Sequence, residues 1–294
     1  MIRNLHFAEC AIQVEAIGDL AEDLLIFLSK GLPETGKAQP QVRFTLEDVE
    51  QSGEIQLFIV DNSNPKSQNA APPNKPQTRQ LKAKGPPNMV ISQLLFLIDF
   101  HLANHASQGL YLHAASLAKN GKAVLLAGNT GSGKSTLSFW LVNNGFQYMS
   151  DEATFIPSGS LECQGFTRPL HIRDDGLDLF DQMDHIAKLS ISFSKEISFG
   201  HLLDASQLNP VLPGEKSKIK AIIFPSYQAD SKPEFEKLTP ALAAFELAQC
   251  LINARNLEKN GFSEIIRLTK IIPCWRFKYG LFDQIQELLK DIDS

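Results

Sequence analysis

Apolar side chains along this chain either alternate with polar ones or recur at helical spacing, and the pattern predicts a mixture of strands and helices. Before residue 107 it predicts a helix over residues 19–28, a strand over 54–60 and an apolar helix over 90–106. Between the last two, residues 61–88 contain six prolines and few large apolar side chains, which is typical of an exposed linker or mobile loop.

These breaks in the pattern divide the chain into three parts. We expect a smaller N-terminal α+β region over residues 1–62, a proline-rich linker or mobile loop over 63–88, and a main α/β domain over 89–294. The main domain is long enough to bury a substantial core of its own.

The pattern is tightest from residue 110 onward. Strands are predicted over 110–118 and 122–127, joined by Asn120-Gly121, because both central positions of a type I′ hairpin require positive φ. The later predicted elements are a helix over 134–144 ending at Gly145, strands over 146–149, 219–224 and 275–279, a helix beginning at Thr239 and Pro240, and a final helix with Phe282, Ile285, Leu288, Leu289 and Ile292 on one face.

Composition narrows the classes of protein. The 294 residues carry a net charge of −5, which argues against a nucleic-acid partner, since phosphate backbones call for a basic face. No apolar run reaches the roughly 18 to 20 residues of a membrane helix, and residues 1–6 lack the apolar core of a secretion signal. The cysteines are scattered and form no CxxC pair, so we expect reduced thiols in a cytoplasmic protein.

A phosphate-binding motif lies between a predicted strand and a predicted helix. Residues 128–135 read Gly-Asn-Thr-Gly-Ser-Gly-Lys-Ser, which fits G-x-x-x-x-G-K-[ST] in full. Its glycines let successive backbone N–H groups turn toward one anion, and the helix start adds the positive end of its dipole. We expect Lys134 to contact the β- and γ-phosphates and the Ser135 hydroxyl to bind Mg²⁺. The alternative is a fortuitous glycine-rich turn.

The donor is expected to be ATP with Mg²⁺, although no identifiable residue separates ATP from GTP or pyrophosphate. The residues expected to bind the nucleotide are Gly128, Asn129, Thr130, Gly131, Ser132, Gly133, Lys134, Ser135 and Thr136.

Two acidic residues, Asp151 and Glu152, end the strand that follows this helix. The strands before and after the helix are expected to run parallel, so their carboxyl ends share an edge, where open α/β sheets bind ligands. One carboxylate is suited to hold Mg²⁺ and the other to accept a proton from an attacking hydroxyl. The alternative is a solvated strand end.

The hairpin register places one histidine near the phosphate loop. Lys119 is expected to lie opposite Lys122. Counting six residues away from the turn along each strand then brings His113 opposite Gly128. Its imidazole is then at the mouth of the site, where it is suited to hydrogen-bond a carboxylate such as Asp151. The alternative is a packed strand histidine.

Two arginines follow, Arg168 and Arg173, in a loop that leads into a strand. Either guanidinium is suited to balance the charge of a phosphoryl group in transfer, and for each the alternative is a surface ion pair.

Taken together, these motifs resemble a known family. His113-Ala114-Ala115, the hairpin, the phosphate loop and Ser150-Asp151-Glu152 are similar to the catalytic domain of HPr kinase/phosphorylase, and more closely to the divergent HPr-kinase-related proteins of bacteria. The similarity covers roughly residues 108–173.

The resemblance implies the fold shared with phosphoenolpyruvate carboxykinases, with an antiparallel hairpin before the P-loop, and the activity of a serine kinase. It also implies that Asp151 is the catalytic base, that His113 assists it and that Glu152 binds the metal, and it makes a homo-oligomer plausible. Residues 170–174 (Leu-His-Ile-Arg-Asp) meet the family's Leu-Glu-Ile-Arg-Gly signature only in part, so neither phosphorolysis nor HPr as substrate is implied.

Three hypotheses follow. The first is an HPr-kinase-related kinase that transfers the γ-phosphoryl group to a serine hydroxyl of a protein, a peptide or a small molecule. The second is a small-molecule kinase of the shikimate or nucleoside type, which usually begins near its P-loop and has an arginine-rich lid; here over 100 residues precede the loop. The third is an ATPase or nucleotide sensor without transfer. We favour the first, with an acceptor that the sequence does not name.

Overall fold

The computed structural model describes residues 1–30, 39–61, 79–173, 194–197 and 200–280. Its strands form sheets of five, eight and three strands, so the chain is a mixed α/β protein, as the sequence predicts. Among the described residues, no helix combines the length and apolar character needed to cross a membrane. The predicted final helix and residues 63–78 of the predicted linker lie outside the described residues.

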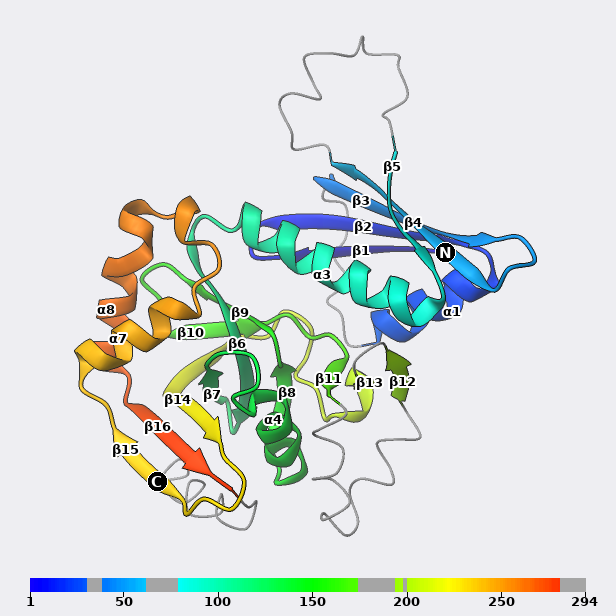
Figure 1. Ribbon diagram of the computed structural model, residues 1–294. Coiled ribbons are helices and arrows are strands. Elements are labelled where there is room, and N and C mark those ends of the chain that lie inside the picture. The colour runs from blue at the N-terminus through cyan, green and yellow to red at the C-terminus, as the bar shows by residue number, and fades with distance from the viewer. Residues whose placement is uncertain (31–38, 62–78, 174–193, 198–199, 281–294) are drawn as a thin grey trace.

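The five-stranded sheet forms the N-terminal part of the molecule (Figure 1). Two helices, α1 and α3, pack on this sheet and on each other. The strands follow chain order, and only β2 and β3 pair in parallel. The elements are β1 (Ile2–Phe7), β2 (Cys10–Ile17), α1 (Asp19–Ser29), β3 (Val42–Val49), β4 (Glu54–Asp61), β5 (Gln80–Gly85) and α3 (Pro87–His105).

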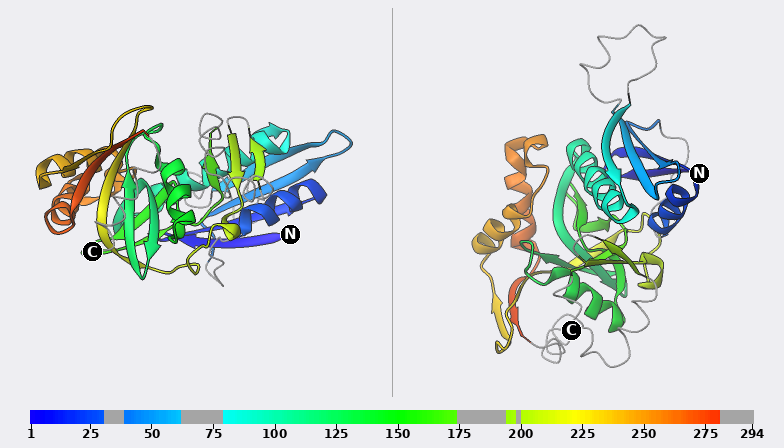
Figure 2. Two further views of the ribbon diagram at one scale, coloured as in Figure 1. Left: turned by 90° about the horizontal axis from the view of Figure 1, so that it is seen from below. Right: turned by 45° about the vertical axis from the view of Figure 1, so that its right-hand side comes forward.

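Two expectations about this region are corrected. The predicted linker contains β5, which pairs with β4 at the sheet edge. Most of its side chains are exposed, so it lacks the apolar alternation that identifies a strand in sequence. Helix α3, expected to open the main domain, shares its core with the N-terminal sheet and lies between that sheet and the rest of the chain (Figure 2).

The hairpin that leads into the phosphate loop has the predicted register. Asn120 and Gly121 have φ values of 53° and 72°, as a type I′ turn requires, and Lys119 lies opposite Lys122. The pairing continues to Ala114 and Ala127, the last residue before the loop. The hairpin consists of β6 (Gly109–Lys119) and β7 (Lys122–Ala127).

The eight-stranded sheet is built around this hairpin. Its order is β10-β9-β6-β7-β14-β16-β15, with β8 also paired to β6, and β7, β14 and β16 run parallel. Its other strands are β8 (Gln147–Ser150), β9 (Ala153–Pro157), β10 (Glu162–Gly165), β14 (Ser217–Tyr227), β15 (Glu234–Lys237) and β16 (Cys274–Tyr279).

Helices cover both faces of this sheet, because successive side chains of a strand point to opposite faces. Leu125 packs beneath α7 (Pro240–Gln249) and α8 (Phe262–Ile271), whereas Val124 and Leu126 pack beneath α4 (Lys134–Asn143). Figure 1 shows α7 and α8 on one side and α4 on the other. The remaining elements are β11 (Leu170–Ile172), β12 (Ser194–Ile197), β13 (Gly200–Leu203) and the short 3-10 helices Ala205–Gln207, Ala254–Asn256 and Glu258–Gly261.

The predicted helix caps form. Thr239 accepts a hydrogen bond from the Leu242 N–H at the start of α7, with Pro240 at the first helical position. Gly145 follows the end of α4 with φ 89°, the conformation of a C-cap glycine. All four cysteines are buried and form no disulfide, as expected for packed thiols.

A single asparagine fixes the start of β6 against α3. The Asn253 side chain is 1% exposed, donates to Ala106 O and Gly109 O at 2.9 Å each, and accepts from the Tyr111 N–H at 2.9 Å. The Asn253 side chain thus provides hydrogen bonds to three backbone groups where the chain passes from the N-terminal part into the main sheet.

We expect Asn253→Ala to lower the free energy of unfolding by about 2–4 kcal/mol, because it leaves these buried backbone groups without their partner. The exposed Asn4→Ala is the control and should change stability by less than about 0.5 kcal/mol. Urea unfolding measures both, and an equal effect of the two substitutions would contradict the role of Asn253.

Candidate functional site

The phosphate loop connects β7 to α4 and is held in place by two tyrosines. Gly133 has φ 92°, and a Cβ atom there would lie 2.3 Å from Tyr279 Oη, so both conformation and space require glycine. The Tyr279 hydroxyl donates to Gly133 O at 3.1 Å, and the Tyr227 N–H donates to Ser132 O at 3.0 Å. The loop is thus supported by the ends of β14 and β16, which lie at the same edge of the sheet as the end of β7.

Lys134, the first residue of α4, folds back over this loop. Its ammonium donates to Gly128 O at 2.7 Å and to Asn129 O at 3.1 Å. Burial lowers its pKa, which the nearby Glu152 carboxylate opposes. The positive charge is therefore located within the loop.

Asp151 and Glu152 lie in a kink between two strands that both pair with β6. The first part of β6, residues 109–113, pairs with β9, and residues 116–118 pair with β8. The Ser150 hydroxyl accepts from the N–H groups of Glu152 and Ala153, which stabilises the kink. At this kink the two carboxylates have different surroundings, because Asp151 is buried whereas Glu152 is only half-buried.

Asp151 is fully buried, with 0% of its surface exposed. One carboxylate oxygen accepts from the Tyr148 hydroxyl and the other from the His171 N–H, each at 3.0 Å. Burial raises its pKa, although Arg168 opposes the shift. Asp151 therefore holds the end of β8 against the start of β11 (Leu170–Ile172) and does not line the cavity described below.

Glu152 and His113 form the pair that faces the cavity. His113 Nδ1 lies 2.9 Å from Glu152 Oε1, and the side chains keep 24% and 34% of their surface exposed. This corrects the expected contact of His113 with Asp151, since only Glu152 points to the side of the kink where the imidazole lies. Burial raises the pKa of Glu152, but the hydrogen bond from His113 and the charge of Arg168 outweigh it and lower the pKa to about 2.

Arg168 lies in a buried cluster of three carboxylates. Its guanidinium nitrogens are 2.6 Å from Asp99, 3.7 Å from Asp151 and 3.6 Å from Glu152, and its side chain is 8% exposed. Arg168 is therefore not part of a surface ion pair, and it does not line the cavity described below. Burial raises the pKa of Asp99 to about 6, despite Arg168. Asp99 belongs to α3, so the N-terminal part reaches this cluster.

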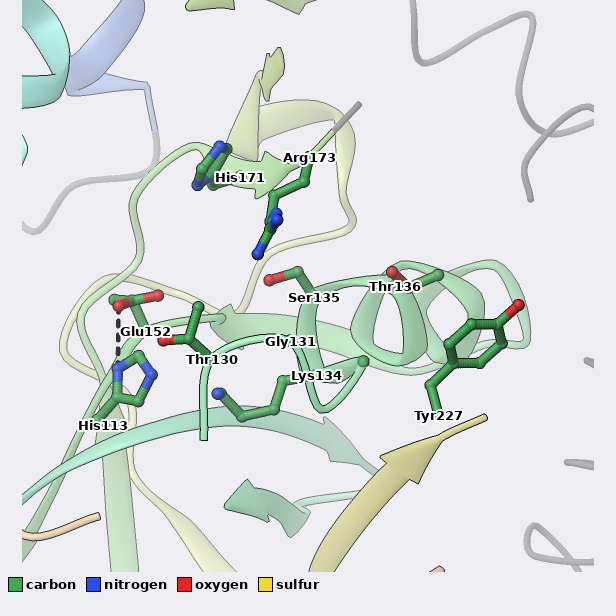
Figure 3. Close-up of a pocket in the computed structure, with 11 residues that line it drawn as sticks. His113, Thr130, Gly131, Lys134, Ser135, Thr136, Glu152, His171, Arg173 and Tyr227 are labelled. Atoms are coloured by element: carbon green, nitrogen blue, oxygen red, sulfur yellow. Dashed lines mark ion pairs between the residues drawn. The ribbon is translucent and has the colours of Figure 1, made fainter. Parts of the chain in front are cut away.

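A cavity of about 280 Å³ brings most of the expected residues together (Figure 3). The His113–Glu152 pair lies at one end, Lys134 and Ser135 lie at its centre, and the Arg173 side chain points toward Ser135 from the opposite wall. The lining residues are His113, Thr130, Gly131, Gly133, Lys134, Ser135, Thr136, Glu152, His171, Arg173 and Tyr227. The other expected loop residues, Gly128, Asn129 and Ser132, line a second cavity behind the loop.

Two oxygen donors that line the cavity fit Mg²⁺. Ser135 and Glu152 present a hydroxyl and a carboxylate, and Mg²⁺ is usually held by one or two protein oxygens together with waters and substrate phosphates. The described residues contain no cluster of three or more His, Cys, Asp or Glu side chains that would hold a metal without a substrate.

Four residues near the site were not identified from the sequence: Asp99, Tyr148, His171 and Tyr227. Asp99 was recognisable in the sequence as a candidate, because it is the one acidic residue in the apolar stretch over 90–106. The other three take their places through strand pairings between distant segments, which leave no local pattern.

Comparisons with known proteins leave the family open. No protein-family model and no curated protein matches the sequence. Among solved structures, the chain is similar to the Hpr(Ser) kinase/phosphatase from Coxiella burnetii, with 13% sequence identity, a TM-score of 0.30, and coverage of 62% of this chain and 87% of that chain. Similarity at this level assigns neither a family nor an activity to this chain.

The buried cluster predicts a pH-dependent stability. The Asp99 carboxyl has an ordinary pKa of 3.8 and a pKa of about 6 in the folded chain, so between these values the folded chain binds more protons and loses stability as pH rises. Asp99→Asn removes this titration. We expect the wild type to lose about 1–2 kcal/mol relative to Asp99→Asn across this interval, which is less than the full shift because the side chain is 19% exposed.

Urea unfolding of both proteins at a series of pH values measures this difference. A difference between wild type and variant that stays constant over the interval, or that grows in the opposite direction, would contradict the assignment of the buried proton to Asp99.

Proposed function

We propose that this protein is an ATP-dependent kinase of the HPr-kinase-related type, which transfers the γ-phosphoryl group to a serine hydroxyl of a protein, a peptide or a small molecule. The observation that carries the proposal is the single cavity in which the loop lysine, Lys134, and the His113–Glu152 pair face the same space. One wall is suited to hold phosphates and the other to orient a hydroxyl.

The donor phosphates occupy the loop. The backbone N–H groups of the loop and the start of α4 attract the β-phosphate. The Lys134 ammonium exchanges its two carbonyl partners, Gly128 O and Asn129 O, for phosphate oxygens, which carry more negative charge. Ser135 and Glu152 are the oxygen donors that would hold Mg²⁺, and the bound cation would supply positive charge next to the phosphates.

Glu152 takes the role of the base that the resemblance gave to Asp151. Glu152 lines the cavity and is oriented by His113, whereas Asp151 is enclosed by Tyr148, Arg168 and the start of β11. With a pKa of about 2, Glu152 is a carboxylate at neutral pH and a weak base. A weak base suffices, because the transition state of phosphoryl transfer is loose and depends mainly on positioning and charge.

In the reaction, the acceptor hydroxyl donates a hydrogen bond to Glu152 and its oxygen attacks the γ-phosphorus in line. The bond from the γ-phosphorus to the bridging oxygen breaks, ADP departs with that oxygen, and the acceptor proton passes to Glu152. Lys134 and Arg173 balance the charge of the phosphoryl group as it moves. Arg173 has this role rather than Arg168, because it lines the cavity.

The alternatives make different demands on the cavity. A nucleotide sensor needs the loop but no oriented base on the opposite wall, whereas an ATPase uses such a group to orient water and labels no acceptor. A small-molecule kinase shares the base, and the identity of the labelled acceptor separates it from a protein kinase.

The roles of the two carboxylates are tested by transfer from γ-labelled ATP with Mg²⁺ to small proteins and metabolites of a lysate, followed by mass identification of the product. We expect Glu152→Gln to lower transfer by about 100-fold or more. Asp151→Asn is the matched variant, and we expect a smaller loss together with lower stability. Full transfer by Glu152→Gln and none by Asp151→Asn would reverse the two roles. Release of free phosphate without a labelled acceptor would favour the ATPase or sensor.

Lys134→Ala should weaken ATP binding by about tenfold or more and lower transfer as well, because the loop loses its charged phosphate donor. The control is Lys122→Ala at the exposed start of β7, which should leave both unchanged. Calorimetric titration with ATP and Mg²⁺ measures the affinity, and an undiminished affinity of Lys134→Ala would contradict binding at the loop.

A further inference from the structure

One aromatic residue of the cavity has no part in the proposed transfer. Tyr227 ends β14 and lines the cavity beyond Thr136, at the end opposite to the His113–Glu152 pair (Figure 3). Its side chain is half-buried, unlike those of Tyr111, Tyr148 and Tyr279, which are fully buried. A large ring on the wall of a charged cavity is suited to a flat, apolar part of a ligand.

The sheet order fixes which part of a nucleotide would lie there. Glu152 is reached from β7 by crossing β6, whereas β14, which ends at Tyr227, is the neighbour of β7 on the other side. The transferred phosphate must lie near Glu152, so the opposite end of a nucleotide bound in the loop points away from Glu152. That end carries the ribose and base, and it leads toward Tyr227.

The ring is held in place before any ligand arrives. The Tyr227 N–H donates to Ser132 O of the loop at 3.0 Å, and the ring packs edge-on against Tyr279 with a centroid distance of 5.5 Å. Tyr279 in turn donates to Gly133 O. A ring fixed to the loop that binds the phosphates loses little freedom when it stacks on a base.

The second cavity, of about 260 Å³, is less suited to a base. It adjoins the loop at Gly128, Asn129 and Ser132 but not at Lys134 or Ser135. Its charged wall includes Arg276, which already pairs with Glu236 and Glu246. A nucleotide whose phosphates contact Lys134 and Ser135 therefore lies on the Tyr227 side of the loop.

We propose that Tyr227 forms the nucleobase subsite, with its ring stacking on the base of the nucleotide whose phosphates lie in the loop. This inference rests on the proposed function, because it requires phosphate binding at residues 128–135. Stacking uses the face of a base, and it adds affinity only for ligands that carry a base.

The experiment compares the binding of ATP with that of inorganic tripolyphosphate, which has the phosphates alone. Both are titrated with Mg²⁺ into the full chain by calorimetry, for wild type, Tyr227→Ala and Tyr227→Phe, with Gln249→Ala of the second cavity as control. We expect Tyr227→Ala to weaken ATP binding by about 5- to 100-fold and to change tripolyphosphate binding by less than about twofold. Tyr227→Phe, which keeps the ring, and Gln249→Ala should bind both ligands as the wild type does.

Other outcomes overturn the inference in distinguishable ways. Equal weakening of both ligands by Tyr227→Ala would show that the ring supports the loop and does not bind a base. No change in ATP affinity, or equal affinities of the wild type for ATP and tripolyphosphate, would show that no base is recognised, with the phosphate site still intact. A wild type that binds neither ligand would overturn the phosphate site and the proposed function with it.

Discussion

The candidate site depends on the Arg168 guanidinium, which is buried among three carboxylates from two parts of the chain. Asp99 comes from α3 of the N-terminal part, and Asp151 and Glu152 come from the kink between β8 and β9. Removing one partner of a buried ion pair leaves an uncompensated charge, at a cost of about 3–5 kcal/mol. The cluster therefore fixes the positions of the N-terminal layer and the acidic kink relative to each other.

The charge balance of this cluster connects structure to chemistry. Three carboxylates share one guanidinium, so the cluster is short of positive charge. Two features offset this excess of negative charge. Burial raises the pKa of Asp99, and Glu152 pairs with His113 at the cavity wall. In the proposed function a divalent cation and the transferred phosphoryl group meet beside Glu152, where the negative surroundings favour the cation. In this proposal Arg168 positions Glu152, and Arg173 faces the phosphates.

Features of the fold that depend on neighbouring residues were predicted from the sequence. The Asn120-Gly121 turn set the hairpin register, Thr239 and Gly145 formed helix caps, and the glycines of residues 128–135 gave the loop between a strand and a helix. Each is a local choice in which backbone conformation selects the residue type. The edge strand β5 was missed, because its mostly exposed side chains carry no alternation.

The parts of the site that sequence reasoning placed differently depend on distant segments. Which of the two adjacent acidic residues faces the cavity is set by the pairing of β6 with both β8 and β9. That pairing places His113 in contact with Glu152 and leaves Asp151 enclosed. Likewise, the cluster around Arg168 forms only because Asp99 of α3 meets an arginine that lies 69 residues further along the chain.

The most direct test of the account is a crystal structure of the protein with Mg²⁺ and an ATP analogue whose γ-phosphoryl group cannot be transferred. We expect the β-phosphate within the loop, the Lys134 ammonium moved from Gly128 O and Asn129 O onto phosphate oxygens, and the terminal phosphate facing Glu152. An analogue bound elsewhere, or one whose terminal phosphate points away from the His113–Glu152 pair, would contradict the proposed kinase site.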